Sequence, residues 1–267
     1  MGSSMNIKPG KFLETIMSEK AREVAEMAEF SDFGNVRATY KLYDFLYENT
    51  AELQIIAECK KASPSLGDIN TEVDLLAQAK SYEQAGAAMI SVLTDPVFFK
   101  GEIDYLREIS ANVAIPTLNK DFIIDEKQIR RAVWAGATVI LLIVACFEGN
   151  ENRLKELYEY AENLGLEILV ETHNQAELDI AHGLGAKIIG VNNRNLKTFE
   201  VSLQNSLDLF HDFKPETVYI SESGVFGTQE ATVLAPDFNA ILVGTALMQS
   251  GNVAKALKNL KIARKRQ

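Results

Sequence analysis

Residues 135–147 read AGATVILLIVACF, and this stretch decides how the 267-residue chain folds. Gly136 can adopt the left-handed backbone that ends a helix, so a helix is expected to stop there. Residues 138–143 are then apolar at almost every position, which is typical of a parallel strand covered by helices on both faces. The apolar run ends at Phe147. It is much shorter than the roughly 18 residues that a membrane-spanning helix needs.

The same unit of helix, glycine and apolar strand recurs along the chain. Three further apolar runs follow a glycine of this kind, at Gly86, Gly165 and Gly185. Expected helix starts at Thr71, Asp125 and Asn174 each carry an acid or amide three residues on, as capping boxes do. The predicted strands are 53–59, 88–93, 115–118, 138–143, 167–171, 187–191, 217–221 and 240–243.

Eight strand–helix units predict an α/β fold, a single closed (β/α)8 or TIM barrel, for which about 250 residues are typical. We expect residues 51–267 to form the barrel and residues 1–50 to be an N-terminal helical extension of one structural domain. The extension is predicted to hold helices at 11–29 and 42–50. The sequence leaves open whether they cover the bottom of the barrel or reach round its mouth.

Composition excludes several classes of function. A hydrophobic content of 47% with 24% charged residues is typical of a packed globular protein and excludes disordered and fibrous chains. The net charge of -10 disfavours binding to nucleic acid or to an anionic membrane. No secretory signal is recognised at the start of the chain, so a cytoplasmic location is expected. A monomer is a possible state, although the sequence does not decide it.

The two cysteines, Cys59 and Cys146, lie in apolar runs with no CxxC spacing. We interpret both as buried thiols rather than as a disulfide or a zinc site, and we expect no metal.

Polar side chains stand where the predicted strands end, which in TIM barrels is the catalytic face. Alternation along the first strand turns Glu58 and Lys60 toward the mouth, and Ile55, Ala57 and Cys59 toward the helices. An acid and an amine so close can serve proton transfer or form a structural ion pair.

Three further strands end in candidate residues. Lys120 ends the third strand and Glu171 the fifth. Asn192 and Arg194 share one face after the sixth strand, where Asn193 takes the other face. Solvated loop residues are the alternative interpretation. His173 follows Glu171 closely, but a surface histidine at a helix start is the expected interpretation.

Small residues follow the last two strands, as SESG at 221–224 and VGTA at 243–246. Backbone N–H groups exposed by such residues can bind a phosphate, and this is the usual phosphate position in the fold. Ordinary tight turns are the alternative.

Six motifs in this order, IIAECKKASPS, LNKDFIID, LVETH, GVNNRNL, SESG and VGTALM, resemble the indole-3-glycerol phosphate synthase family over residues 8–260. The resemblance implies ring closure of 1-(2-carboxyphenylamino)-1-deoxyribulose 5-phosphate with loss of carbon dioxide and water, and no cofactor. By position, Lys120 is then the general acid and Glu171 the acid/base of the later dehydration. Lys60 contacts the substrate carboxylate, and Glu58 and Asn192 orient the substrate.

The resemblance also implies a binding role for other residues. Arg194 supports the site electrostatically, and Phe99 packs against the anthranilate ring. The implied phosphate-binding positions are Ser63, Ser223, Gly224, Gly244 and Thr245. One position departs from the family pattern, because Leu66 stands where a lysine is common. Asn119, before Lys120, also differs but should turn away from the mouth.

Two rival functions remain on the same fold. A phosphoribosyl anthranilate isomerase-like enzyme would use a Cys and an Asp as its acid/base pair, but Cys59 has the wrong parity and no Asp ends the fifth strand. A barrel that only binds a phosphosugar would not require proton-transfer groups on separate strands.

Overall fold

The computed structural model describes residues 10–33, 36–63, 67–68 and 73–265. Eight parallel strands close into one barrel in the order β1–β10–β9–β8–β7–β6–β5–β4. The barrel strands are β1 (Gln54–Cys59), β4 (Met89–Leu93), β5 (Thr117–Lys120), β6 (Val139–Ile143), β7 (Glu167–Thr172), β8 (Ile188–Asn192), β9 (Val218–Glu222) and β10 (Ala240–Val243). The predicted TIM barrel is confirmed.

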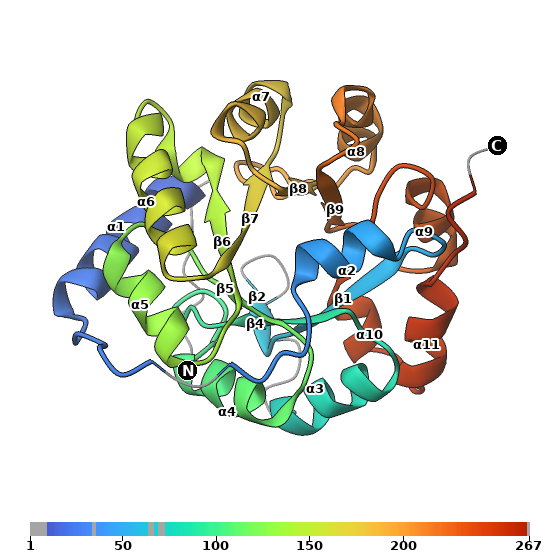
Figure 1. Ribbon diagram of the computed structural model, residues 1–267, viewed down its shortest axis with the longest axis horizontal. Coiled ribbons are helices and arrows are strands. Elements are labelled where there is room, and N and C mark those ends of the chain that lie inside the picture. Colours follow the sequence, from blue (N-terminus) through green and yellow to red (C-terminus); the bar gives the residue numbers. More distant parts are fainter. Residues whose placement is uncertain (1–9, 34–35, 64–66, 69–72, 266–267) are drawn as a thin grey trace.

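Helices surround the strands in a ring, as Figure 1 shows. They are α3 (Leu75–Gln84), α4 (Ile103–Asn112), α5 (Glu126–Trp134), α6 (Glu151–Asn163), α7 (Gln175–Leu184), α8 (Gln204–Leu209), α9 (Thr228–Leu234), α10 (Thr245–Met248) and α11 (Val253–Leu260). Two short 3-10 helices, η1 (Val144–Phe147) and η2 (Phe210–Asp212), follow β6 and α8, and a small antiparallel pair, β2 (Ala62–Ser63) and β3 (Gly67–Asp68), follows β1.

The predicted strand boundaries agree with the structure to within about a residue, except at the third strand. That strand was expected at 115–118 and spans Thr117–Lys120. Pro116 has no N–H to donate to the ladder, although its carbonyl accepts from the Ile90 N–H at 3.1 Å. The pairing therefore begins after the proline, and Lys120 is the last residue of the strand.

Side-chain alternation separates the apolar residues into two packed clusters. Ile56, Leu118 and Leu169 belong to the cluster that fills the barrel interior. Ile55 and Cys59 belong to the cluster between the strands and the helices. Because both faces of each strand are covered, the strands are apolar at nearly every position.

Local signals predicted several helix ends correctly. Gly136 has a positive φ of 86° just before β6. Asp125 and Gln128 form a reciprocal capping box at the start of α5, and the Asn174 side chain accepts the Glu177 N–H at the start of α7. At α3 the cap is Asp74, and the predicted cap Thr71 lies outside the described residues.

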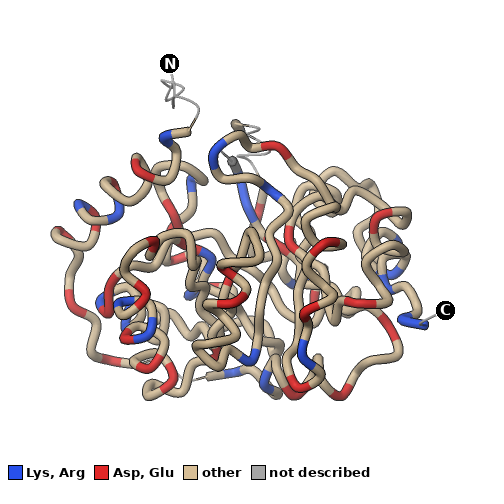
Figure 2. The backbone as a smooth tube through the Cα atoms, turned by 90° about the horizontal axis from the view of Figure 1, so that it is seen from above, with Lys and Arg blue, Asp and Glu red and all other residues tan. Residues whose placement is uncertain are grey.

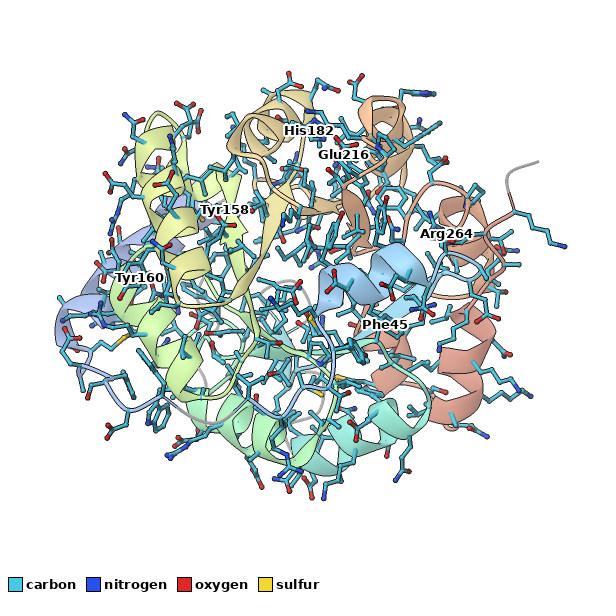
Figure 3. All side chains as sticks on the ribbon, viewed as in Figure 1. Phe45, Tyr158, Tyr160, His182, Glu216 and Arg264 are labelled. Carbon is cyan, nitrogen blue, oxygen red and sulfur yellow. The ribbon has the colours of Figure 1, made fainter. Side chains whose placement is uncertain are left out.

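The N-terminal segment does both of the things that the sequence left open. Helix α2 (Leu42–Glu48) lies over the amino ends of the strands, where the Glu167 carboxylate accepts the N–H groups of Leu42 and Tyr43 at 2.7 and 2.9 Å. Figure 1 shows α2 in front of the strands, and Phe45 on this helix is labelled in Figure 3. The bottom of the barrel is therefore closed by α2.

Helix α1 (Phe12–Glu26) reaches the opposite end of the barrel. Its first residue, Phe12, packs edge to face on Phe98, Phe122 and Phe199, with ring centroids 5.9, 6.5 and 4.6 Å apart. The two helices end earlier than expected, at Glu26 and Glu48. The domain boundary at residue 50 stays a prediction.

Charged residues are spread over the whole molecule. Figure 2 shows acidic and basic positions intermixed along the backbone. No helix among the described residues is both long and apolar enough to span a membrane. Cys59 is buried, whereas Cys146 is only partly buried, which corrects the expectation for the second thiol; both are free.

Candidate active site

A pocket opens at the carboxyl ends of the barrel strands, with about 1040 Å³ of empty space, part of it open to solvent. Every predicted site residue whose side chain is described lines it, and these residues are Glu58, Lys60, Phe99, Lys120, Glu171, Asn192, Arg194, Ser223, Gly224, Gly244 and Thr245. Ser63 is in β2, but its side chain lies outside the described residues, as does the whole of Leu66.

The order of the strands places unlike walls of this pocket opposite each other. Strands β9 and β10, which precede the small residues Gly224 and Gly244, lie across the barrel from β5 and β6. Phe122, after β5, and Ile143, at the end of β6, give that far wall an apolar surface. Strands β1 and β7, which carry Glu58 and Glu171, also face each other. An elongated ligand can therefore lie between an apolar wall and a glycine-rich wall, with charged groups on both sides.

Glu58 joins the two lysines of the pocket. Its Oε2 accepts hydrogen bonds from Lys120 Nζ at 2.7 Å and from Ser91 Oγ at 3.0 Å, and its Oε1 lies 3.6 Å from Lys60 Nζ. All three ionic groups are largely buried, with side chains 4%, 20% and 13% exposed for Glu58, Lys120 and Lys60. The predicted alternation along β1 is therefore confirmed, because Glu58 and Lys60 share one face and meet a lysine from β5.

Charges in this cluster set its protonation. Burial would raise the pKa of Glu58, but the charges of Lys120 and Lys60 outweigh it, so the pKa is lowered. Burial would lower the pKa of Lys120, but the negative charges of Glu58 and of nearby acids outweigh it and raise the pKa. Burial lowers the pKa of Lys60, assisted by the like charge of Lys120. Lys120 is thus held as an ammonium group, and Lys60 is the readier of the two to lose its proton.

Glu222, at the end of β9, is a buried acid that sequence reasoning missed. Burial, together with the charge of Glu171, raises its pKa well above its ordinary value. Neither of its carboxyl oxygens accepts a hydrogen bond by geometry from another described group. Gly190 makes room for this side chain, because a Cβ there would clash with its carboxyl group. Alternation along β9 was the available signal, since Ile220 and Glu222 share the interior face.

The residues after β8 divide between the pocket and the outer helices. Asn192 Oδ1 accepts the Ser223 hydroxyl and the Arg194 N–H, each at 3.0 Å, beside the pocket. Asn193 turns the other way and is buried, with its amide bonded to Ser221 Oγ at 3.0 Å and to Ser206 Oγ at 2.7 Å. The alternation is confirmed, but the interpretation of Asn193 as a solvated residue is wrong. Asn119, as expected, turns away from the pocket and is buried.

Backbone conformation and close packing at the glycine-rich wall depend on a few small residues. Ser223 and Gly224 both have positive φ, 68° and 87°. A Cβ at Gly244 would come 3.2 Å from Lys60 Cε and 3.3 Å from Glu58 Cβ, so glycine allows close packing there. The small residues therefore let backbone approach a ligand beside the charged cluster.

Helix α1 is joined by buried ion pairs to residues next to the apolar wall and next to Lys120. Lys20 is fully buried and lies within ion-pair distance of Asp95 Oδ1 at 2.5 Å and Asp121 Oδ1 at 2.8 Å. Asp95 Oδ2 accepts the N–H groups of Phe98 and Phe99 at 2.6 and 3.3 Å, and Asp121 directly follows Lys120. The position of Phe99 is thus set through a buried ion cluster.

His173 is more closely connected to the site than the sequence suggested. Its Nε2 lies 3.4 Å from Glu171 Oε2, and its side chain is only 12% exposed. The interpretation as a surface histidine is therefore wrong. The other two histidines are elsewhere: His182, which is labelled in Figure 3, bonds Tyr219 Oη at 2.8 Å, and His211 is exposed.

Comparison with known proteins agrees with the geometry. The family model described as indole-3-glycerol phosphate synthase matches residues 13–260. The protein of that name in Lactococcus lactis subsp. cremoris (strain MG1363) is 71% identical to this chain, over 98% of this chain and 98% of the relative. The protein in Streptococcus pneumoniae (strain Hungary19A-6) is 64% identical over 94% and 98%, and that in Streptococcus thermophilus (strain CNRZ 1066) is 63% identical over 94% and 97%. The chain therefore belongs to the indole-3-glycerol phosphate synthase family.

Proposed function

We propose that the chain is the carboxy-lyase of tryptophan biosynthesis that closes the ring of 1-(2-carboxyphenylamino)-1-deoxyribulose 5-phosphate and releases indole-3-glycerol phosphate, carbon dioxide and water. One observation carries the proposal: an apolar wall and a glycine-rich wall face each other, with Lys60, Lys120 and Glu171 in the pocket between them. A substrate with an aromatic ring at one end and a phosphate at the other matches this arrangement.

Binding follows from the two walls. The anthranilate ring packs against Phe99 and Phe122, whose own ring centroids are 6.3 Å apart. The phosphate binds at Ser223, Gly224, Gly244 and Thr245, with Ser63 as the further position implied by the resemblance. Binding at both ends holds the ribulose carbonyl near the charged cluster, which reduces the entropy lost on reaching the transition state.

Ring closure uses Lys120 as the general acid. As the ring carbon that bears the carboxylate attacks the ribulose carbonyl, negative charge develops on the carbonyl oxygen, and Lys120 protonates it. The raised pKa of Lys120 keeps the proton in place until that charge appears. Carbon dioxide then leaves from the tetrahedral ring carbon, and the ring regains its aromaticity.

Dehydration uses Glu171 as the acid/base. Loss of the hydroxyl group formed from the carbonyl requires a proton on the leaving oxygen and removal of one from carbon. Glu222 supports Glu171, because the raised pKa of Glu222 keeps a proton beside it.

The remaining residues orient the substrate. Lys60 contacts its carboxylate, and Glu58 fixes both lysines through its two oxygens. Asn192 orients the sugar hydroxyls, and Arg194 adds positive charge beside Glu58. The division of proton transfers between Lys60, Lys120 and Glu171 belongs to the proposal and is testable by substitution.

The direct test incubates the purified protein with the substrate and records indole fluorescence. We expect turnover without any added metal or organic cofactor. Affinity for the substrate without turnover would favour a barrel that only binds phosphosugars. Conversion of phosphoribosyl anthranilate instead would favour the isomerase.

We also propose that the enzyme acts in the cytoplasm as a monomer, without nucleic-acid or membrane partners. Two free thiols suit a reducing compartment, and the net charge of -10 disfavours binding to a polyanion. Sedimentation of the purified protein at two concentrations measures its oligomeric state, and we expect the mass of a single chain at both.

A further inference from the structure

His173 and Glu177 lead from Glu171 toward the surface of the protein. His173 Nε2 lies 3.4 Å from Glu171 Oε2, and His173 Nδ1 lies 3.0 Å from Glu177 Oε1. Exposure of the side chains rises along this chain, from 3% for Glu171 to 12% for His173 and 16% for Glu177. Each ring nitrogen therefore has its own carboxylate, one beside the pocket and one nearer to solvent.

The start of α7 fixes the orientation of the ring. Glu177 Oε1 accepts the backbone N–H of His173 at 3.1 Å, and Glu177 Oε2 accepts Asn174 Nδ2 at 3.1 Å. Asn174 in turn caps the helix by accepting the Glu177 N–H at 2.9 Å. With Nδ1 held on Glu177, the buried Nε2 is left 3.4 Å from Glu171 Oε2, within ion-pair distance, and it has no hydrogen-bond partner among the described groups.

Charges around the ring favour its protonated form. Burial would lower the pKa of His173, but the hydrogen bond to Glu177 and the charges of Glu171 and Glu177 outweigh burial, so the pKa is raised. The other titratable groups that interact with these acids are Cys146 after β6, whose raised pKa keeps it a neutral thiol, and Lys120 and Glu222 beside Glu171.

The proposed reaction requires a proton from outside the pocket. The substrate enters as a carboxylate and loses that group as neutral carbon dioxide, so each turnover takes up one proton when charges are balanced. Lys120 gives one proton to the carbonyl oxygen and Glu171 gives one to the leaving hydroxyl, whereas dehydration releases only one proton, from carbon. With that proton returned to the neutral amine of Lys120, Glu171 ends the turnover as a carboxylate that must be reprotonated while a bound ligand fills the mouth above it. A second connection to solvent behind Glu171 would supply that proton.

Building on the function proposed above, we propose that His173 is a positioning residue that orients Glu171 and returns a proton to it from solvent through the Glu171–His173–Glu177 chain. After Glu171 has given its proton to the reacting molecule, the Nε2–H of the imidazolium ring moves to the Glu171 carboxylate. The ring becomes neutral and keeps its Nδ1–H on Glu177. The ring then leaves Glu177 and turns toward water, where the bare nitrogen regains a proton, and its return to Glu177 completes the uptake of one proton per turnover.

The test compares His173→Ala with the wild type at constant pH and ionic strength while the concentration of imidazole buffer is raised. Direct acid/base groups contribute about 100-fold or more, and for a residue that acts through one of them we expect kcat to fall about 10-fold, with KM changed less. Imidazole, which fits the vacated space and carries the missing proton, should restore part of the loss in His173→Ala and leave the wild type unchanged. His211→Ala, at an exposed site, is the matched control and should show neither effect.

Restoration by imidazole separates proton return from a merely structural role, which added buffer would not repair. The inference is overturned if kcat of His173→Ala stays within about twofold of the wild type, or if it falls and imidazole does not raise it. If the alanine variant does not fold, His173→Gln carries the same test, because its amide can still bond Glu177 but cannot relay a proton. Wild-type protein without turnover would instead refute the proposed function.

Discussion

Glu222 is a residue whose ionisation the fold opposes, since it is 1% exposed and lies beside Glu171. Its native pKa is raised above the ordinary value of 4.5, whereas the unfolded chain titrates near that value. Between the two pKa values the native state binds more protons than the unfolded state, so stability falls as pH rises.

Glu222→Gln removes this titration while keeping the shape of the side chain. We expect the variant to gain stability relative to the wild type as pH rises from 4.5 toward the raised native pKa, and to show no such gain below 4.5. Urea unfolding at a series of pH values measures it. A constant difference in unfolding free energy across the series would contradict the assignment of a protonated Glu222.

Lys120→Met tests the general acid at the same scale. The change removes the proton donor and keeps the length of the side chain, so we expect kcat to fall about 100-fold or more with a modest change in substrate affinity. Steady-state fluorescence assays measure kcat, and a binding titration with the substrate measures its affinity. Unchanged turnover would remove Lys120 from the mechanism.

Glu171→Gln should slow dehydration more than ring closure, because the amide cannot exchange a proton. An unconverted intermediate should then accumulate and be seen by rapid-quench chromatography. If substrate disappears slowly with no intermediate, Glu171 acts before dehydration and its role is assigned wrongly.

At the scale of elements, helix α1 is held on the barrel by a lysine, Lys20, whose charged group is buried away from solvent. Lys20 Nζ lies 2.8 Å from Asp121 Oδ1 and close to Asp95, which are both buried. Removing one partner from such a cluster leaves uncompensated charge and costs about 3–5 kcal/mol. The exposed pair of Lys155 and Glu159 on α6, 3.8 Å apart, is the matched case and contributes below about 1 kcal/mol.

Lys20→Met should therefore destabilise the protein several-fold more than Lys155→Met in urea unfolding. It should also raise KM, because Asp95 holds the N–H of Phe99 at the apolar wall. Equal effects of the two substitutions would mean that α1 is held by its apolar contacts alone.

At the scale of the whole molecule, periodicity was enough to predict the barrel and most of its mouth. Glu58 and Lys60 were placed correctly because alternation along one strand needs no knowledge of its neighbours. Pro116 displaced the third strand because pairing, not apolar character, sets where a ladder begins. Alternation is a local property, so a single sequence reveals which strand residues point into the site.

Burial depends on what the closed barrel brings together, and there sequence reasoning failed. Asn193 and His173 looked like solvated polar residues, yet Ser206, Ser221 and Glu171 surround them after closure. Glu222 was overlooked because its raised pKa arises from burial in the closed barrel and from Glu171, on a strand two positions away. Likewise, Lys20 gains its partners only when α1 docks.

A crystal structure with bound indole-3-glycerol phosphate tests the central claim, that one phosphosugar spans the mouth between the two walls. It should place the phosphate on the backbone at Gly224 and Gly244 and the indole ring against Phe99. Lys120 Nζ and a carboxyl oxygen of Glu171 should each lie within about 3.5 Å of the ligand. A ligand bound with its phosphate at the aromatic wall, or out of reach of both side chains, would contradict the account.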